Sequence, residues 1–477
     1  MCDVVVRNIR AGSVVVEIRN SMENQIIARL KRTIIAATSI LLSAALAPGA
    51  HAASQYIQHN LVSDIPGIAD QTDPNLVNPW GISMSSTSPF WISNNHAGIA
   101  AVYNGQGQPT PAGSPIRVTI PIPSGSTPPA APTGQVFNDT TGFNVAGKPA
   151  SFIFATEDGT ISGWNPSADP ANSIVLVDNS ASGAVYKGLA LANTGNGPLL
   201  YAANFNSGNI DVFDGNLSPI TSTGAFSDPN LPVGFAPFNV QRIGRKLYVT
   251  YAMQDSARHD DVAGAGNGLI NVFDFYGNLA GRLVSKGALN SPWGLALAPG
   301  NFGDFSNALL VGNFGDGTIN AFDPCSGEYL GNLQDANGTV IAIPGLWGLS
   351  FGNGRGAGDA TTLYFTAGIP GPGNIEDHGL FGSIQVGDSS AAPKAQASLA
   401  NISNFAFVPP TITIAVGTQV QWTNQDGFAH TVTADDARFQ SNSLEHNDTY
   451  SQTFSAVGTY SYHCSIHPFM KGKIVVQ

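Results

Sequence analysis

Charged residues and cysteines are both scarce in this 477-residue sequence. Asp, Glu, Lys and Arg make up 11% of it, and there are three cysteines. Basic residues number 20 against 32 acidic ones, and no basic cluster follows residue 52. Because nucleic-acid binding depends on neutralising phosphates with Lys and Arg, we exclude nucleic acid as a partner. After residue 52 only Cys325 and Cys464 remain, and two distant cysteines do not make a disulfide scaffold.

Long apolar runs are also missing. The run from Thr33 to Leu46 is shorter than the roughly 20 residues that span a bilayer. Arg29, Lys31 and Arg32 precede it, and Ala50-His51-Ala52 follows. We therefore expect residues 1–52 to be an N-terminal extension with a signal peptide, and the protein to be periplasmic or secreted without stable membrane insertion. A membrane anchor is the alternative interpretation of this run.

Two common redox motifs are absent as well. There is no Gly-rich dinucleotide fingerprint and no haem-attachment Cys-x-x-Cys-His motif. Glycine and proline are instead abundant, with 54 and 31 copies. Such a composition is typical of all-β proteins with many short strands and tight turns, so we predict an all-β fold.

A short phrase recurs along the middle of the chain: a Gly, four residues, an aromatic residue, and then Asn or Asp. Five clear copies run from Gly98 to Asn104, Gly159 to Asn165, Gly208 to Asp214, Gly268 to Asp274 and Gly317 to Asp323. A sixth copy, from Gly379, has Ile384-Gln385 instead. Successive glycines are 49 to 62 residues apart, as expected for four-stranded propeller blades with variable loops.

A second phrase supports this repeat. Pro79-Trp80-Gly81-Ile82, Pro292-Trp293-Gly294-Leu295 and Leu346-Trp347-Gly348-Leu349 each begin an alternating strand pattern, and Phe238-Asn239-Val240 is a weaker version. We predict a six-bladed β-propeller over residues 53–386, in which neighbouring blades bury the apolar faces that one blade cannot bury alone. This region resembles the exported bacterial six-bladed propellers of the NHL type, whose motifs are not specific to one activity.

Several titratable residues fall shortly before the repeated glycines. If the register of the repeat is right, His96, Asp158, His259, Asp261 and His378 share one rim of the propeller. Loops on a rigid frame often carry sites, and His with carboxylates could bind a divalent metal or a substrate. Turn composition explains the same pattern without any function. The propeller ligand, and whether the propeller is an enzyme, stay open.

A linker and a second domain follow. Residues 387–398 have no apolar periodicity, so we predict that they form a short flexible linker. Residues 399–477 contain short alternating segments, such as Thr411–Ile414 and Val420–Trp422, that are typical of a β-sandwich.

The chemistry of this domain lies in two pieces of sequence. One holds His430, and the other holds Cys464, His467 and Met470 with the spacing Cys-x2-His-x2-Met. Two imidazoles and a thiolate in a trigonal plane, with a weak axial thioether, define a blue-copper site. We predict one type 1 copper bound by these four residues. Zinc is less well suited, since its fourth ligand is usually a carboxylate, water or Cys.

Residues 399–477 resemble the plastocyanin-like cupredoxins, and the string from Tyr462 to Met470 is most similar to the amicyanin branch. The resemblance implies that His430, Cys464, His467 and Met470 are copper ligands. It also implies that His467 reaches the surface through an apolar patch, here near Pro468 and Phe469, where a redox partner protein docks. Thr431 departs from the family pattern, because many members have there an Asn that braces the ligand loop.

The main hypothesis is an exported blue-copper electron-transfer protein whose propeller binds a partner or a substrate. In one alternative the propeller is a periplasmic oxidoreductase that passes electrons to the copper domain. In another the protein is a non-redox copper-binding or surface-binding module.

Overall fold

The computed structural model describes residues 54–371, 376–387, 398–414, 418–454 and 456–476. The predicted signal peptide lies outside them. The described residues form strands, with two short 3-10 helices, Ser180–Ser182 and Gly303–Phe305, and no α-helix. None of their helices is long and apolar enough to cross a bilayer. The prediction of an all-β protein is therefore confirmed.

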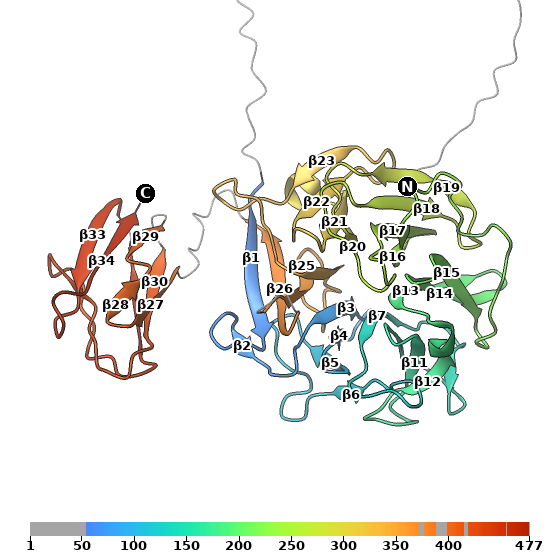
Figure 1. The fold of residues 1–477 in the computed structure, drawn as a ribbon, viewed down its shortest axis with the longest axis horizontal. Coiled ribbons are helices and arrows are strands. Elements are labelled where there is room, and N and C mark those ends of the chain that lie inside the picture. Colours follow the sequence, from blue (N-terminus) through green and yellow to red (C-terminus); the bar gives the residue numbers. More distant parts are fainter. Residues whose placement is uncertain (1–53, 372–375, 388–397, 415–417, 455, 477) are drawn as a thin grey trace, which may run out of the picture. The chain divides into compact units, whose positions relative to one another are not determined.

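Residues 54–371 and 376–387 form six principal sheets (Figure 1). Sheets one to three consist of β3 (Pro79–Ser83), β4 (Phe90–Asn94), β5 (Ile99–Tyr103) and β6 (Arg117–Thr119); β7 (Pro132–Phe137), β10 (Phe152–Thr156), β11 (Thr160–Trp164) and β12 (Ile174–Asp178); and β13 (Tyr186–Thr194), β14 (Gly197–Asn204) and β15 (Asn209–Asp214). A small hairpin joins β8 (Asn144–Val145) to β9 (Lys148–Pro149).

Sheets four to six complete the set. They consist of β16 (Phe235–Ile243), β17 (Lys246–Met253), β18 (Leu269–Phe273) and β19 (Leu279–Ser285); β20 (Pro292–Leu297), β21 (Leu309–Asn313), β22 (Ile319–Phe322) and β23 (Tyr329–Asn332); and β24 (Leu346–Phe351), β25 (Leu363–Ile369), β26 (His378–Val386), β1 (Tyr56–Ser63) and β2 (Gln71–Thr72). The first strand of the described chain, β1, thus pairs antiparallel with β26, the last strand of this region.

The two repeated phrases mark equivalent strands in these sheets. Each copy of the Gly-to-aromatic phrase coincides with the third strand of its sheet, from β5 to β26. Its aromatic residue is buried in all five clear copies. The Trp-Gly phrase coincides with first strands, namely β3, β20 and β24, and the weaker Phe238 version lies in β16. The interpretation of the sequence as a repeat of one supersecondary unit therefore matches the strand order.

The first strands pack tightly against one another. Each contacts the first strand of the next sheet, and β24 contacts β3, so that these contacts close a ring. Glycine makes this approach possible. A Cβ on Gly81 would lie 2.4 Å from the Thr133 carbonyl oxygen, and one on Gly348 would lie 2.7 Å from that of Trp80. The rings of Trp80 and Trp347 stack at 3.5 Å between centroids within this centre.

The second domain is a two-sheet sandwich. One sheet contains β27 (Ser398–Ser403), β28 (Ala406–Val408), β30 (Gln419–Asn424) and β32 (Thr449–Thr453); the other contains β29 (Thr411–Ile414), β31 (Thr433–Ala434), β33 (Gly458–His463) and β34 (Lys471–Val476). Inward residues alternate with outward ones along β29 and β30, as the sequence pattern predicts. Trp422 fills the core, and its indole N–H donates to the Tyr462 hydroxyl at 3.1 Å.

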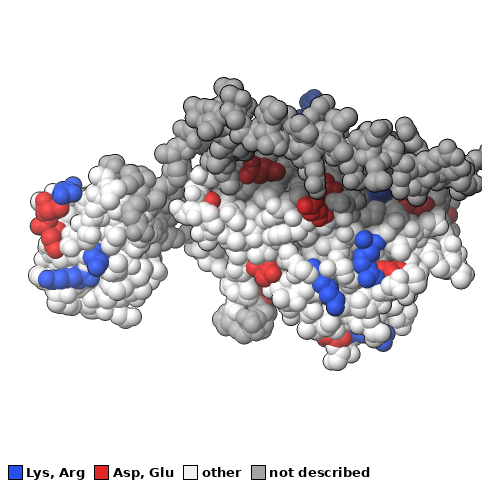
Figure 2. Space-filling model, turned by 90° about the horizontal axis from the view of Figure 1, so that it is seen from above, with Lys and Arg blue, Asp and Glu red and all other residues white. Residues whose placement is uncertain are grey.

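The surface reflects the low charge content. On the face shown in Figure 2, Lys, Arg, Asp and Glu side chains stand singly or in small groups among uncharged atoms. The described residues on this face form no continuous basic area.

Candidate metal centre

His430 lies in a connecting segment and not in one of the regular strands. Its segment runs between β30 and β31, and a bridge to Leu444 fixes it through two backbone hydrogen bonds of 3.1 and 2.8 Å. The His430 side chain is fully buried. This position presents the imidazole to the end of the sandwich where β33 also ends.

Cys464, His467 and Met470 lie on the short loop between β33 and β34. The loop closes on itself, because the Met470 N–H donates to the His467 carbonyl oxygen at 2.9 Å, and the Cys464 N–H donates to the Met470 carbonyl oxygen at 3.2 Å. Cys464 and Met470 are buried. The loop therefore holds the three residues in a compact turn facing His430.

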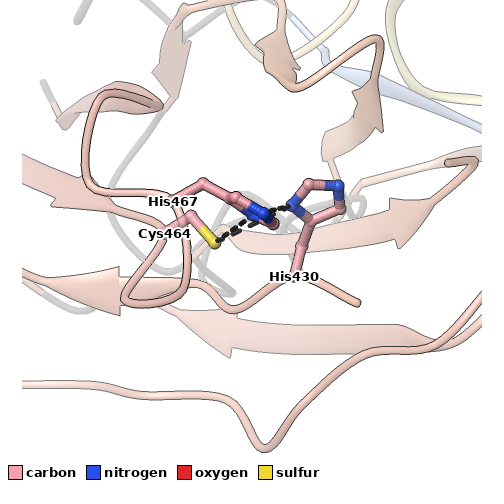
Figure 3. Close-up of side chains that lie close together, drawn as sticks. All are labelled: His430, Cys464 and His467. Atoms are coloured by element: carbon pink, nitrogen blue, oxygen red, sulfur yellow. Dashed lines mark hydrogen bonds between the residues drawn. The ribbon is translucent and has the colours of Figure 1, made fainter. Parts of the chain in front are cut away.

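Three donor atoms converge at this point (Figure 3). The Cys464 Sγ lies 3.8 Å from the Nδ1 atoms of both His430 and His467, and those two nitrogens are 3.2 Å apart. Ligands about 2.0–2.3 Å from one ion in a trigonal plane would be roughly 3.5–3.8 Å from each other. The spacing and the donor set of two imidazoles and one thiol thus fit a trigonal metal centre.

Asp426 orients the His430 ring. Its carboxylate accepts from the backbone N–H groups of Asn404 and Phe405 and lies 3.0 Å from the His430 Nε2. Although its burial acts in the opposite direction, these hydrogen bonds hold the pKa of Asp426 below its usual value. Burial lowers the pKa of His430, which favours the neutral ring. With Nε2–H donating to Asp426, the lone pair of Nδ1 faces Cys464 and His467.

Thr431 braces the loop that begins at Cys464. The Ser465 N–H donates to the Thr431 Oγ1 at 2.7 Å, and the Thr431 N–H donates to the Cys464 Sγ at 3.3 Å. A hydroxyl therefore links the loop to the His430 segment at the position where the family pattern has an amide. His463 is directed elsewhere, with its Nδ1 2.6 Å from the Asp435 carboxylate.

Apolar side chains surround His467 at the surface. Phe469 and Phe428 are 71% and 63% exposed, and Ile466 is 47% exposed. The His467 ring packs edge-on against Phe405 at 5.0 Å and lies 6.0 Å from the Phe469 ring. Exposed apolar side chains thus lie around His467 and its neighbour Phe405.

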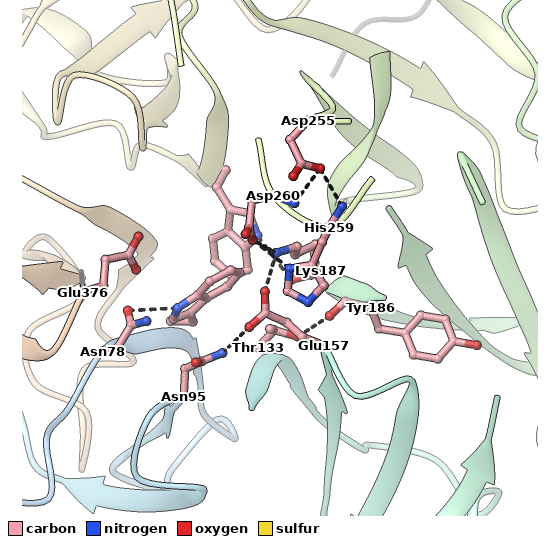
Figure 4. Close-up of polar contacts among 12 residues, drawn as sticks. Asn78, Asn95, Thr133, Glu157, Tyr186, Lys187, Asp255, His259, Asp260 and Glu376 are labelled. Atoms are coloured by element: carbon pink, nitrogen blue, oxygen red, sulfur yellow. Dashed lines mark hydrogen bonds and ion pairs between the residues drawn. The ribbon is translucent and has the colours of Figure 1, made fainter. Parts of the chain in front are cut away.

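A second cluster of titratable groups lies in the N-terminal domain, around Lys187 (Figure 4). This lysine is fully buried and pairs with Glu157 and, at 3.2 Å, with Asp260. Its ammonium also lies 5.1 Å from the centroid of the Trp80 ring. Burial acts against its charged form, but the two carboxylates outweigh this effect and raise the pKa of Lys187. The two carboxylates therefore favour the charged form of this buried lysine.

Other acidic groups of this cluster carry perturbed pKa values. Burial raises the pKa of Asp158 and Asp261, and it raises the pKa of Glu376 to about 8. The hydrogen bond to Asp260 raises the pKa of His259. Donor atoms of Glu157, His259 and Asp260 lie within 4.8 Å of one another, as a metal site would require.

The five predicted rim residues do not all take part. Asp158, His259 and Asp261 lie at this cluster, where Asp158 interacts electrostatically with His259, and Asp261 with Lys187. His378 instead contacts Asp64, at 2.7 Å from its Nδ1, and His96 is exposed.

Lys187 was missed by the sequence analysis, although the pattern contains a signal for it. Lys187-Gly188 occupies β13, the first strand of its sheet, as Trp80-Gly81 occupies β3 and Trp293-Gly294 occupies β20. A lysine thus stands where other sheets place a buried tryptophan. A charged residue in that register predicts a buried cation that needs carboxylate partners.

Comparisons with known proteins agree with the metal centre. Residues 395–477 match the model of the copper binding proteins of the plastocyanin/azurin family. Amicyanin-alpha of Methylorubrum extorquens is 40% identical over 81 residues, which cover 16% of this chain and 68% of that protein. Amicyanin of Paracoccus denitrificans is 29% identical over 117 residues, covering 24% of this chain and 84% of that protein.

A different relative covers most of the chain. The uncharacterized protein R648 of Acanthamoeba polyphaga mimivirus is 35% identical over 335 residues, which is 68% of this chain and 78% of that protein. A match of this length extends well beyond residues 395–477. The chain therefore belongs to one family with the mimivirus protein R648, and its C-terminal domain belongs to the plastocyanin/azurin family of copper-binding proteins.

Proposed function

We propose that this protein is an exported, periplasmic or secreted, electron-transfer protein with one type 1 copper held by His430, Cys464, His467 and Met470. The observation that carries this proposal is the convergence of the Cys464 Sγ and two imidazole Nδ1 atoms within 3.2–3.8 Å. Membership of the copper-binding family supports it. When bound, copper supplies a centre that accepts and releases one electron.

The protein's own residues would hold the ligands in place. Asp426 fixes the tautomer and the angle of His430, Thr431 ties the ligand loop to the neighbouring segment, and burial keeps water from Cys464. A site that changes little between oxidation states suits electron transfer. The apolar patch around His467 suits a redox partner protein that docks weakly and leaves quickly.

The proposal extends to the N-terminal domain, which would be a closed six-bladed propeller of the NHL type over residues 53–386, joined through a linker at 387–398. The six sheets, the ring of contacts among their first strands and the pairing of β1 with β26 support this architecture. Its role would be to bind the partner or the substrate on the rim that carries His259 and Asp261.

A second candidate function is a propeller-based oxidoreductase that passes electrons to the copper domain. The grouping of Glu157, His259 and Asp260 within 4.8 Å favours a site there. Its test is the double variant His259→Ala with Asp260→Asn. Loss of substrate-dependent copper reduction, with an unchanged copper spectrum, would support the oxidoreductase. Full retention of reduction would leave the propeller as a docking domain. A non-redox copper-binding module would show neither substrate-dependent nor partner-dependent reduction.

The copper proposal is tested on the full chain loaded with Cu(II). We expect an intense visible absorption band and one paramagnetic copper per chain, because the Cys464 thiolate donates into Cu(II). Cys464→Ser should abolish the band. His446→Ala changes an exposed histidine and should leave it intact. A full-strength band in the Cys464→Ser protein would refute the assignment of this ligand.

A further inference from the structure

The third sheet of the N-terminal domain has one strand fewer than its neighbours. Among the described residues it contains β13, β14 and β15, whereas the other five principal sheets contain four or five strands. In Figure 1, β15 is the outer strand of this sheet. Its outer edge is therefore open where the equivalent strand of another sheet would have a neighbour.

The first sheet shows what is missing, because Gly98 and Gly208 align as copies of one repeat. After β5 the chain turns, the Thr110 N–H donates to the Val102 carbonyl oxygen, and β6 then pairs with residues Ile99–Ala101. After β15 the chain forms the equivalent hydrogen bond, in which the Ile220 N–H donates to the Val212 carbonyl oxygen at 2.8 Å.

Beyond this hydrogen bond the third sheet differs from the first. The chain leaves β15 after Ile220, and the Phe226 N–H donates to the Gly277 carbonyl oxygen beside the fourth sheet. No described strand therefore pairs with the outer edge of residues 209–211, the counterparts of Ile99–Ala101.

The backbone of Ile210 faces this open edge. In an antiparallel strand, the N–H and C=O of one residue point to the same side, and this side alternates along the strand. The Val212 carbonyl oxygen points outward to the Ile220 N–H, so the N–H and C=O of Ile210, two residues earlier, point outward as well. Unpaired strand edges are templates for another strand.

A groove runs along the same edge. It encloses about 1080 Å³ and is lined by Asn209, Ile210, Asp211, Val212 and residues 219–223, among others. This volume is above the roughly 300–1,000 Å³ of small-molecule sites. The lining includes Asp211 and Asp214 but no Lys, Arg or His. The groove is therefore large, and its only charged side chains, Asp211 and Asp214, are acidic.

We propose that β15 accepts an extended, basic peptide segment of a partner protein as the fourth strand of the third sheet. Main-chain hydrogen bonds to Ile210 would supply the affinity, as in other cases of strand addition, and the carboxylates would favour a Lys or Arg in the segment. The unpaired residues 209–211 are as many as the three residues of β6 in the first sheet. This inference is independent of the copper site.

The chain itself provides the probe. A labelled synthetic peptide with the sequence of Pro115–Pro121 reproduces the strand that fills this place in the first sheet and contains Arg117. Fluorescence anisotropy with the full-length protein should detect binding, and amide hydrogen exchange should show protection at Ile210. Replacing Arg117 by Glu in the peptide should weaken binding at least tenfold at low salt.

A matched pair of peptides tests the strand geometry without altering the protein. In the first sheet Val118 lies opposite Ala100, the counterpart of Ile210, whereas the Thr119 N–H points away and donates to the Ala171 carbonyl oxygen. N-methylation at the Val118 position should therefore weaken binding at least tenfold, and N-methylation at the Thr119 position should not. Ile210→Pro in the protein should also abolish binding.

Three results would overturn the proposal. One is equal binding of both methylated peptides. Another is the failure of the probe together with a library of seven-residue peptides that each carry one Lys or Arg. The third is protection of the Ile210 amide from hydrogen exchange, on self-association of the protein or on addition of oligosaccharides, while no peptide binds.

Discussion

At the scale of single residues, two aspartates hold histidines in the copper domain with different consequences. Asp426 lies 3.0 Å from the Nε2 of the buried His430, and Asp435 lies 2.6 Å from the Nδ1 of His463, which points away from the donor cluster. The similar contacts provide a comparison in which only one aspartate supports a proposed ligand.

We predict that Asp426→Asn lowers copper affinity about 10- to 100-fold, because a neutral amide supports the metal-binding tautomer of His430 less well. Asp435→Asn should leave the affinity unchanged. Competition with a copper chelator, followed through the visible band, measures both. Equal affinities of the two variants would contradict the orienting role of Asp426.

Glu376 should make the stability of the N-terminal domain depend on pH. Its carboxylate accepts from the Trp347 indole N–H, and burial raises its pKa to about 8, with Glu157 and Asp261 acting in the same direction and Lys187 against it. A glutamate in an unfolded chain titrates near about 4.3. Between these values the folded chain binds more protons, so this group makes stability fall as pH rises through that window and level off above about 8.

Glu376→Gln keeps an acceptor for Trp347 but removes the ionisation. We expect it to raise the free energy of unfolding at pH 9 by roughly 1–3 kcal/mol and to have little effect at pH 4. Urea unfolding at several pH values measures this. Glu328→Gln, at an exposed position, is the control. Parallel pH profiles for Glu376→Gln and the unaltered protein would contradict the prediction.

At the scale of strands, glycine sets how closely the first strands approach. We predict that Gly81→Ala destabilises the N-terminal domain by about 1–3 kcal/mol, since its Cβ would lie 2.4 Å from the Thr133 carbonyl oxygen in β7. Gly195→Ala, where nothing lies within 4 Å, should stay within about 0.5 kcal/mol. Thermal unfolding distinguishes them, and equal midpoints would argue against tight packing at β3.

The repeat was the most predictive feature of the sequence at this scale. The spacing of the repeated phrase predicted the positions of the third strands, because each such strand needs a tight turn before it and a buried aromatic residue at its end. Both features lie within a few residues of each other in the sequence, as from Gly98 to Tyr103. The missing fourth strand was not predictable, because the departure after Ile220 depends on pairing with Gly277, far along the chain. The register of Lys187 in the repeat was readable from the sequence, but its partners Glu157 and Asp260 were not, since they come from other sheets.

The copper domain shows the same contrast. The spacing of Cys464, His467 and Met470 was informative because all three lie on one loop. The role of Asp426 was not foreseen, as its contact with His430 depends on how the backbone at Asn404 and Phe405 folds over it.

At the scale of the whole molecule, the copper-binding family match is confined to residues 395–477, which contain both sheets of the sandwich and their core. We predict that this segment, expressed alone, folds and binds copper with the same visible band as the full chain. Absorption and circular dichroism of the two proteins provide the comparison. A colourless or unfolded segment beside a blue full-length protein would show that the N-terminal domain is needed for the site.

The pairing of β1 with β26 also bears on how the protein is made. Tyr56 lies opposite Val386, so one sheet joins residues about 330 positions apart. Such a long-range contact is slow to form, because the loop-closure entropy must be overcome before the strands can pair. During synthesis, β1 leaves the ribosome long before its partner exists. The N-terminal domain can therefore be completed only when almost all of it has been translated, and an edge strand stays exposed until then.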